Sequence, residues 1–145
     1  MDRKLEVVCV PVSDIDRAKA FYAERAGFKI DYDSTFTEEY RVVQLTPPGS
    51  GCSILIGTGV WAWQSASLPS LAHMEPGSLM GLQLVVPDIE GARTELVDKG
   101  VDVSEIQHFE NGGWVAGPGG DWNSFVFFSD PDGNGWVIQE SPARL

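Results

Sequence analysis

The sequence predicts an α+β fold built from two consecutive copies of one β-α-β-β-β module. The first observation is an internal repeat at an offset of 74: residues 8–18 align with residues 82–92, and in both an apolar alternation leads into an Asp-Ile-acid-x-Ala pattern. The second is a repeat at an offset of 84, where residues 47–56 align with residues 131–140 and a Pro/Gly turn leads into an apolar strand. Two matches in the same order along the chain indicate a duplicated architecture.

Each copy is expected to pass from its first strand into a helix. Asp14 and Asp88 suit the N-cap, because a carboxylate accepts hydrogen bonds from the free N–H groups of the first helical turn. Gly27 and Gly100 supply the left-handed residue that ends each helix. Apolar stripes at helical spacing connect these signals; they consist of Ile15, Ala18 and Tyr22 in one copy and of Ile89, Ala92 and Leu96 in the other.

Three strands are expected after each helix. In the first copy, residues 28–33 and 40–45 precede the Pro/Gly turn, and a third strand follows it. In the second copy, roughly residues 101–108 and then residues 125–129 take these places before the turn. Each pair of strands around a Pro/Gly turn has the pattern of a hairpin.

The whole chain, residues 1–145, is expected to form a single domain. Module one covers about residues 1–60, a linker rich in Ser, Pro and Trp covers about 61–79, and module two covers about 80–145. A chain of this length buries a hydrophobic core, and its 43% of hydrophobic residues is ordinary for a globular protein.

Charge and composition exclude several classes of protein. The formal net charge of −11 argues against nucleic-acid binding, which needs clustered Lys and Arg, and favours cationic small molecules. No apolar run reaches about 18 residues, so no membrane span is expected. The N-terminus lacks the apolar stretch of a signal peptide, which predicts a cytoplasmic protein. Cys9 and Cys52 do not have the spacing of a zinc site.

Two segments of the chain resemble one known superfamily. Residues 12–18, with Phe21-Tyr22 and Gly27-Phe28, are similar to the opening of vicinal oxygen chelate proteins, and residues 128–135, Phe-Ser-Asp-Pro-Asp-Gly-Asn-Gly, resemble their closing hairpin. This superfamily includes glyoxalase I, extradiol dioxygenases, fosfomycin-modifying enzymes and bleomycin-resistance binding proteins. The resemblance covers nearly the whole chain. It implies two modules whose mixed sheets curve together into a cup, with the helices packed outside.

The resemblance also implies where the four metal ligands of the superfamily's enzymes lie. The matching positions are Val7, Ser53, Gly81 and Val137. None of these residues carries the imidazole, carboxylate or thiolate donor that divalent metal ions need. We therefore expect neither a metal site nor a cofactor.

Strand alternation predicts which other side chains share the cup with these four positions. Two residues along the same strands lie Cys9, Leu55, Gln83 and Gln139. Each of the two glutamines either bonds to a neighbouring group or water, or faces a ligand. The same parity places Cys52 on the opposite face from Cys9, so no disulfide is expected between them.

Aromatic residues gather around flexible segments. Trp61 and Trp63 lie in the linker, and Trp114 and Trp122 flank the glycine-rich residues 112–122. This segment is interpreted either as a lid over the cup or as a plug of its edge. The predicted ligand-binding residues are, in full, Cys9, Ser53, Leu55, Gln83, Trp114, Trp122 and Gln139.

Acid/base groups are few. Glu38 and Tyr40 precede a strand of module one, and His108 lies close to the glycine-rich segment; these three are the catalytic candidates. Neither a Ser-His-Asp nor a Cys-His arrangement is readable from the sequence.

These observations predict a metal-independent protein that binds a small organic ligand, such as an antibiotic or natural product, and confers resistance by sequestering it. The alternative is a metal-free lyase or isomerase of the same superfamily, and a second alternative is a non-catalytic protein-interaction module. A homodimer is expected, because exposed sheet edges otherwise favour uncontrolled association.

Overall fold

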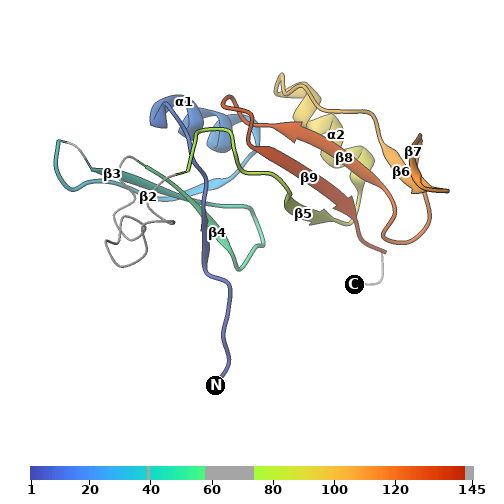
Figure 1. Cartoon of the computed structure of the whole chain (residues 1–145), viewed down its shortest axis with the longest axis horizontal. Helices are drawn as coiled ribbons and strands as arrows, with labels where there is room; N and C mark the ends of the chain where they lie inside the picture. The colour runs from blue at the N-terminus through green and yellow to red at the C-terminus, as the bar shows by residue number, and fades with distance from the viewer. Residues whose placement is uncertain (39, 58–73, 143–145) are drawn as a thin grey trace. The chain divides into compact units, whose positions relative to one another are not determined.

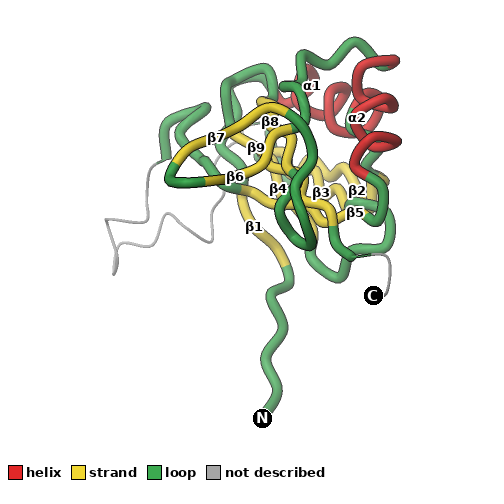
Figure 2. The backbone as a smooth tube through the Cα atoms, turned by 90° about the vertical axis from the view of Figure 1, so that its right-hand side faces the viewer, coloured by secondary structure: helices red, strands yellow, loops and turns green. Residues whose placement is uncertain are grey.

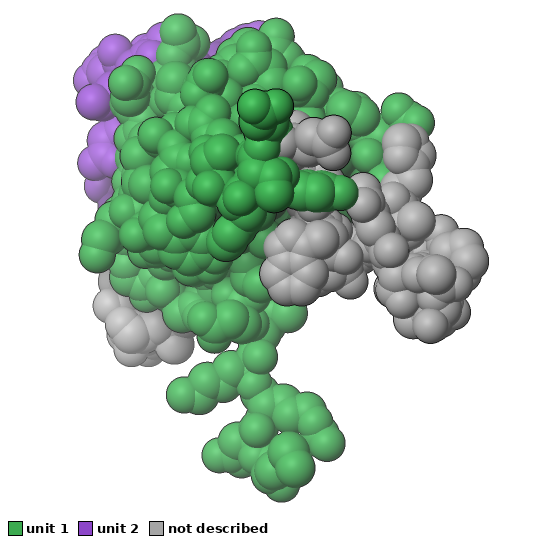
Figure 3. Space-filling model, turned by 90° about the vertical axis from the view of Figure 1, so that its left-hand side faces the viewer, with its two compact units in different colours: residues 1–79, 131–134 green, residues 80–130, 135–145 purple. Residues whose placement is uncertain are grey.

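A computed structural model describes residues 1–38, 40–57 and 74–142. The chain divides into two compact units, coloured separately in Figure 3. Unit 1 comprises Met1–Leu79 and Pro131–Asn134, and unit 2 comprises Met80–Asp130 and Gly135–Leu145. Each unit contains a mixed sheet and a helical segment, which confirms the predicted α+β class. No helix among the described residues is long and apolar enough to cross a membrane.

Unit 1 has the predicted β-α-β-β-β order. Its sheet has the strand order β1-β4-β3-β2, in which β1 runs parallel to β4 and the remaining pairs are antiparallel. The elements are β1 (Val7–Cys9), α1 (Ile15–Ala20), η1 (Phe21–Arg25), β2 (Lys29–Thr35), β3 (Arg41–Thr46) and β4 (Ser53–Gly57). Of the predicted linker, residues 61–73, with Trp61 and Trp63, lie outside the described residues.

The predicted start and end of the first helix are confirmed. The side chain of Asp14 accepts a hydrogen bond from the backbone N–H of Arg17 at 3.0 Å, as an N-cap does. Gly27 has a positive φ of 78°, which glycine adopts at little cost, and it directs the chain from the helix into β2. The helix continues from α1 into a wider turn of π type, η1, where neighbouring Phe21 and Tyr22 are both buried.

One face of the unit 1 sheet forms the core with α1. Because side chains alternate along a strand, Val43 and Leu45 of β3 and Ile54 and Ile56 of β4 point to the same side, and all four are buried. Arg41, which alternation places on the same side of β3, bonds to Asp16 of α1, so the helix packs on this side; Figure 1 shows α1 beside the sheet. The opposite side, which we call the distal face of unit 1, carries the alternate residues of each strand.

The turn Pro131–Asn134 is anchored within unit 1 by its polar side chains. The carboxylate of Asp132 accepts hydrogen bonds from the backbone N–H and the hydroxyl of Ser13, at 3.1 and 2.5 Å. Asn134, which has no exposed surface, donates to the carbonyl of Pro11 and accepts from the N–H of Leu79. The Asp-Pro-Asp-Gly-Asn motif thus supplies both the turn and the groups that fix the loop before α1.

Unit 2 repeats the plan with one additional strand. Its sheet has the order β5-β9-β8-β6-β7, with β5 parallel to β9. The elements are β5 (Leu82–Val86), α2 (Ile89–Asp98), β6 (Gln107–Glu110), β7 (Gly113–Ala116), β8 (Phe125–Ser129) and β9 (Gly135–Glu140). Figure 2 shows β6 and β7 side by side as a hairpin.

Two details of the predicted second module are wrong. The strand expected over residues 101–108 is mostly irregular: only an isolated bridge at Val103 precedes β6, which begins at Gln107. The glycine-rich residues 112–122, expected to be loose, contain β7. The hairpin pairing of β7 with β6 outweighs the low strand propensity of its glycine.

Helix α2 covers one face of the unit 2 sheet. Asp88 caps its N-terminus by accepting from the N–H of Gly91 at 3.0 Å, as predicted. Ile89 and Leu96 of the helix are buried, as are Val126 of β8 and Ile138 of β9. Figure 1 shows α2 along β8 and β9. We call the opposite face the distal face of unit 2.

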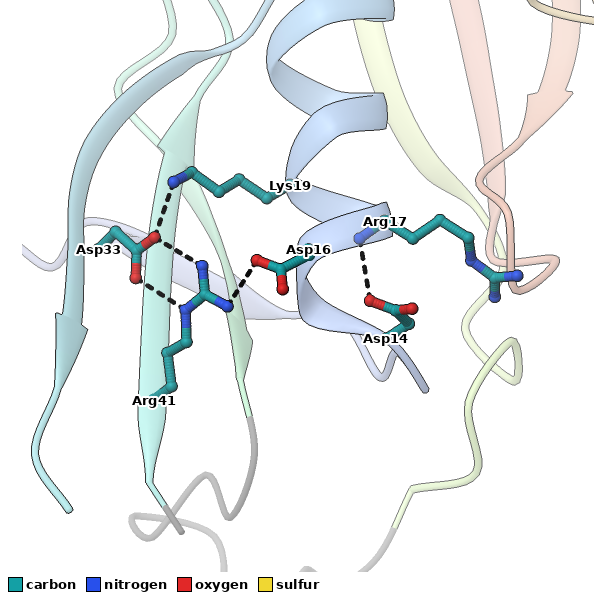
Figure 4. Close-up of polar contacts among 6 residues, drawn as sticks. All are labelled: Asp14, Asp16, Arg17, Lys19, Asp33 and Arg41. Atoms are coloured by element: carbon teal, nitrogen blue, oxygen red, sulfur yellow. Dashed lines mark hydrogen bonds and ion pairs between the residues drawn. The ribbon is translucent and has the colours of Figure 1, made fainter. Parts of the chain in front are cut away.

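An ion network ties α1 to the edge of the unit 1 sheet (Figure 4). The guanidinium of Arg41 binds both carboxylate oxygens of Asp33, at 3.0 and 2.8 Å, and reaches Asp16 at 2.7 Å. Lys19 binds Asp33 from the helix at 2.7 Å. Bidentate geometry and two cations make this pairing stronger than an ordinary surface ion pair. Arg41 is therefore occupied by two carboxylates of its own chain.

This network makes the stability of the protein sensitive to acid. Hydrogen bonds from Arg41, and then from Lys19, hold the pKa of Asp33 well below its usual value of 3.8. A carboxyl group whose pKa is lowered by folding stabilises the folded state above its unfolded pKa, and this contribution is lost as the pH falls. We expect Asp33→Asn to lower the free energy of unfolding by about 1 kcal/mol at pH 7, and by less at pH 3. Urea unfolding at both pH values measures this difference. If Asp33→Asn changes the free energy of unfolding equally at both pH values, or if the control Asp98→Asn changes it as much, then the ion pairs of Asp33 do not stabilise the protein as described.

Candidate functional site

The strand register decides which side chains lie on the distal face of unit 2. Gln83 and Val85 of β5 are the Cα partners of Val137 and Gln139 of β9, and the same two β9 residues are the partners of Phe127 and Phe125 of β8. Directly paired residues share a face. The distal face therefore carries both glutamines next to two phenylalanines, whereas the alternate residues of β8 and β9 pack towards α2.

The two glutamines form an oriented chain of hydrogen bonds. Gln83 Nε2 donates to Gln139 Oε1 at 2.6 Å, and Gln139 Nε2 donates to the backbone carbonyl of Trp122 at 2.7 Å. A carbonyl only accepts, so it fixes the orientation of the Gln139 amide, which in turn fixes that of Gln83. The outer end of the chain is then Gln83 Oε1, an acceptor that meets no donor among the described residues.

Trp122 holds an unusual backbone conformation at the inner end of this chain. Its φ is 62°, in the left-handed region that bulky residues rarely adopt. The hydrogen bond from Gln139 holds its carbonyl in place, and the next residue, Asn123, bonds to both the N–H and the carbonyl of Phe109. Strained residues fixed by their surroundings are frequent at binding sites.

Four aromatic side chains form a cluster on this face, centred on Trp114. Its ring lies edge to face with those of Phe109, Phe125 and Phe127, at centroid distances of 5.5, 5.3 and 5.2 Å. Such contacts add about 0.5–1.5 kcal/mol each beyond the buried area. Trp114 is nevertheless 50% exposed. It belongs to strand β7 and packs on the sheet, so its position is that of a wall of the distal face rather than of a mobile lid.

His108, a predicted catalytic candidate, has both ring nitrogens engaged. Nδ1 lies 2.8 Å from the carbonyl of Gly117, and Nε2 lies 2.9 Å from Glu110 Oε2. Two acceptors favour the doubly protonated ring, and the hydrogen bond to Gly117, followed by that to Glu110, raises the pKa of His108 above 6.5. A general base needs an unprotonated nitrogen, which this arrangement disfavours.

The other two catalytic candidates lie in the turn between β2 and β3 of unit 1. Glu38 is exposed, and Tyr40 is half-buried, with its backbone bonded to Phe36 and Thr37. Among the described residues, neither side chain forms a polar cluster with a nucleophile or a second acid.

Three further predicted ligand-binding residues share the distal face of unit 1. Ser53 is the Cα partner of Val7, and Leu55 is the partner of Cys9, so all four point to the same side, as alternation predicted. Cys9 is buried, and burial raises the pKa of its thiol to about 12. It therefore remains an uncharged thiol at neutral pH and acts as a small apolar side chain. Both cysteines are free.

The sequence did not indicate a polar cluster that lies next to Ser53 on this face. We call it the Asp31 cluster; its members are Asp31, Tyr32, Gln44, Thr46 and Ser53. Asp31 accepts hydrogen bonds from Thr46 Oγ1 and, at 3.1 Å, from Gln44 Nε2. The hydroxyls of Thr46 and Ser53 lie 2.6 Å apart. The register of β2 shifts between Ile30 and Tyr32, so Asp31 is the extra residue of a β-bulge.

The metal positions of the superfamily's enzymes do not fit a metal ion in this chain. The side chains of Val7 and Val137 offer no donor atom, Gly81 has no side chain, and the Ser53 hydroxyl is already bonded to Thr46. The partner of Val137 on β5 is Gln83, a neutral amide. Within residues 1–38, 40–57 and 74–142, no group of three His, Cys, Asp or Glu side chains is placed to hold a metal. No step of a metal-dependent reaction is therefore assigned to these residues.

Comparison with known proteins places this geometry in a family. A model of the glyoxalase/bleomycin resistance protein/dioxygenase superfamily matches residues 4–138. TnmS3, described as an antibiotic binding protein from Streptomyces sp. CB03234, is 30% identical, with a TM-score of 0.69 and 97% of each chain covered.

Two further relatives support the assignment. A member of the same superfamily from Sphaerobacter thermophilus DSM 20745 is 25% identical, with a TM-score of 0.70 over 97% of this chain and 98% of that one. The uncharacterized protein YetH of Bacillus subtilis (strain 168) is 25% identical over 97% of this chain and its own full length. The chain belongs to the glyoxalase/bleomycin resistance protein/dioxygenase superfamily.

Proposed function

We propose that this protein binds a small aromatic molecule on the distal face of unit 2, without a metal ion, and sequesters it unchanged. The observation that carries the proposal is the half-exposed ring of Trp114, held by three phenylalanines beside an oriented amide chain. The ring offers a rigid apolar surface for a planar group. Gln83 Oε1 offers an acceptor to a hydroxyl or N–H group at the rim of that ligand.

The resemblance to TnmS3 supports binding of a natural product. That protein is described as binding an antibiotic, and it aligns with 97% of this chain at 30% identity. Ligand sites of this kind combine apolar and aromatic walls with a few fixed polar groups, as on the distal face of unit 2. Fold alone does not assign the ligand, so the proposal depends on the aromatic cluster and the amide chain.

Binding accounts for the described side chains better than catalysis does. The nitrogens of His108 are both engaged, and the thiol of Cys9 is kept uncharged by burial. A metal-free lyase or isomerase requires a free acid or base near the ligand. Mass spectrometry of the ligand after incubation separates the two functions, because a bound molecule is recovered unchanged and a substrate is not. The homodimer and the cytoplasmic location remain predictions.

The aromatic face is tested by two substitutions. A panel of aromatic natural products is screened by tryptophan fluorescence, and calorimetry then gives the dissociation constant of each hit. We expect Trp114→Ala to weaken binding by about 2 kcal/mol, as for a central aromatic contact. Gln83→Leu is expected to weaken binding by about 1 kcal/mol, which is what one neutral hydrogen bond contributes.

The matched control is Phe36→Ala, which removes another exposed aromatic side chain, in the turn after β2. It should leave the affinity unchanged. If Trp114→Ala and Gln83→Leu both leave every hit bound as tightly as before, the distal face of unit 2 is not the site. If no compound of the panel binds, the proposed function itself is contradicted.

Metal independence is tested by elemental analysis and by chelation. Protein dialysed without chelator is expected to contain far less than one transition-metal ion per chain, because Val7, Ser53, Gly81 and Val137 provide no adequate donor set. EDTA should leave the affinity for an aromatic hit unchanged. Metal independence is contradicted if the protein holds one metal ion per chain and removal of that ion abolishes binding. Such an ion would have to be held by residues other than these four.

A further inference from the structure

Every side-chain hydroxyl and amide hydrogen of the Asp31 cluster is directed to another member of the cluster. Thr46 gives its single hydroxyl hydrogen to Asp31, because a carboxylate only accepts. The hydrogen between Thr46 and Ser53 therefore comes from Ser53. Gln44 directs its amide N–H groups to Asp31 and, at 3.5 Å, to Ser53, and its Oε1 accepts from the hydroxyl of Tyr32 at 3.2 Å. The cluster consequently presents only acceptor atoms to an approaching molecule.

The cluster also carries a negative charge that its own donors stabilise. The hydrogen bond from Thr46, followed by that from Gln44, lowers the pKa of Asp31 below 3.8, so the carboxylate is ionised at neutral pH. Both of these bonds go to Oδ2, and Oδ1 meets no donor among the described residues. Lys29, the Cα partner of Thr46, contributes only the weakest of the influences on this pKa, and in the described part of the chain it forms no ion pair with Asp31.

The position of the cluster favours contact with a ligand rather than a role in the core. Its side chains lie on the distal face of unit 1, opposite α1, and Asp31 is exposed. The bulge of β2 is what directs Asp31 to the same face as Tyr32, against the ordinary alternation of a strand. Bulges that redirect a side chain in this way are over-represented next to active sites.

We propose that the Asp31 cluster is a subsite for a protonated amine, with the ammonium group bound by Asp31 Oδ1 and by lone pairs of the surrounding hydroxyl and amide oxygens. An ammonium has three donors and no acceptor, which complements an acceptor-only surface with one negative charge. The net charge of −11 attracts such a cation from solution. This inference goes beyond the proposed function: it assigns a second site, on unit 1, and rests only on the contacts of the Asp31 cluster.

The test uses two probes that differ in one group. 1-Naphthylmethylamine is a cation at pH 7, and 1-naphthalenemethanol is its neutral counterpart with the same ring. Each is titrated into the full-length protein, and the shifts of the backbone amide signals of residues 31, 44, 46 and 53 and of the Trp114 indole signal are followed by NMR. We expect the amine to shift the signals of residues 31, 44, 46 and 53, which the alcohol leaves unchanged, and the naphthalene ring of either probe to shift the Trp114 signal independently.

Variants then assign the effect to the carboxylate. Asp31→Asn should weaken binding of the amine at the Asp31 cluster about five-fold and leave binding of the alcohol unchanged, because an exposed ion pair contributes modestly. Thr46→Val, which removes a hydrogen bond to Asp31, should give a smaller loss of the same kind. Asp98→Asn makes the same charge change at the exposed end of α2 and should have no effect. Added salt should weaken the amine selectively.

The outcomes separate this inference from the proposed function. If the amine shifts the Trp114 signal but binds Asp31→Asn as tightly as the unmodified protein, the amine subsite is wrong and the proposed function stands. If neither probe shifts Trp114 but the amine binds in an Asp31-dependent manner, the subsite stands and the aromatic site is wrong for these rings. Absence of any shift with either probe overturns the subsite.

Discussion

Parallel pairing of the first and last strand of each unit is the constraint on which the other features depend. β1 pairs with β4 and β5 pairs with β9, and in each case the residues of one strand face those of the other directly. Since side chains alternate along a strand, this register divides every strand between a face packed on a helix and a distal face. A slip of β5 or β9 by one residue would turn the glutamine of that strand towards α2 and remove the amide chain.

The distal face of unit 2 is largely aromatic and that of unit 1 carries a charged cluster, but both present hydrogen-bond acceptors. In unit 2, the carbonyl of Trp122 orients both amides, so that the chain ends in the acceptor of Gln83. In unit 1, the carboxylate of Asp31 accepts the hydrogen bonds of its neighbours Gln44 and Thr46, so the cluster offers only acceptor atoms to a ligand. In both cases one group that can only accept determines the direction of every hydrogen bond attached to it. An acidic chain with acceptor-bearing faces is suited to ligands rich in donors.

Much of the fold was predictable from local signals, and part of the site was not. Asp14 and Asp88 predict the starts of their helices because an N-cap contact lies within one helical turn. The alternation of side chains along β5 and β9 was enough to place Gln83 beside Gln139. Strand β7 was missed because its stability comes from pairing with β6 and from the packing of Trp114 on phenylalanines distant in sequence. Asp31 was missed because no glycine or proline marks its bulge: only the register with β3 reveals that one residue of β2 is extra.

If the distal face of unit 2 binds an aromatic ligand, the ring of that ligand lies against Trp114. The most direct measurement is the set of intermolecular NOEs between a bound aromatic hit and the assigned side chains of the protein. NOEs are expected from the ligand ring to the Trp114 indole and to Phe127, and from the hydroxyl or N–H group of the ligand to the neighbourhood of Gln83. NOEs confined to other regions of the protein, with none to Trp114, would contradict this placement of the ligand.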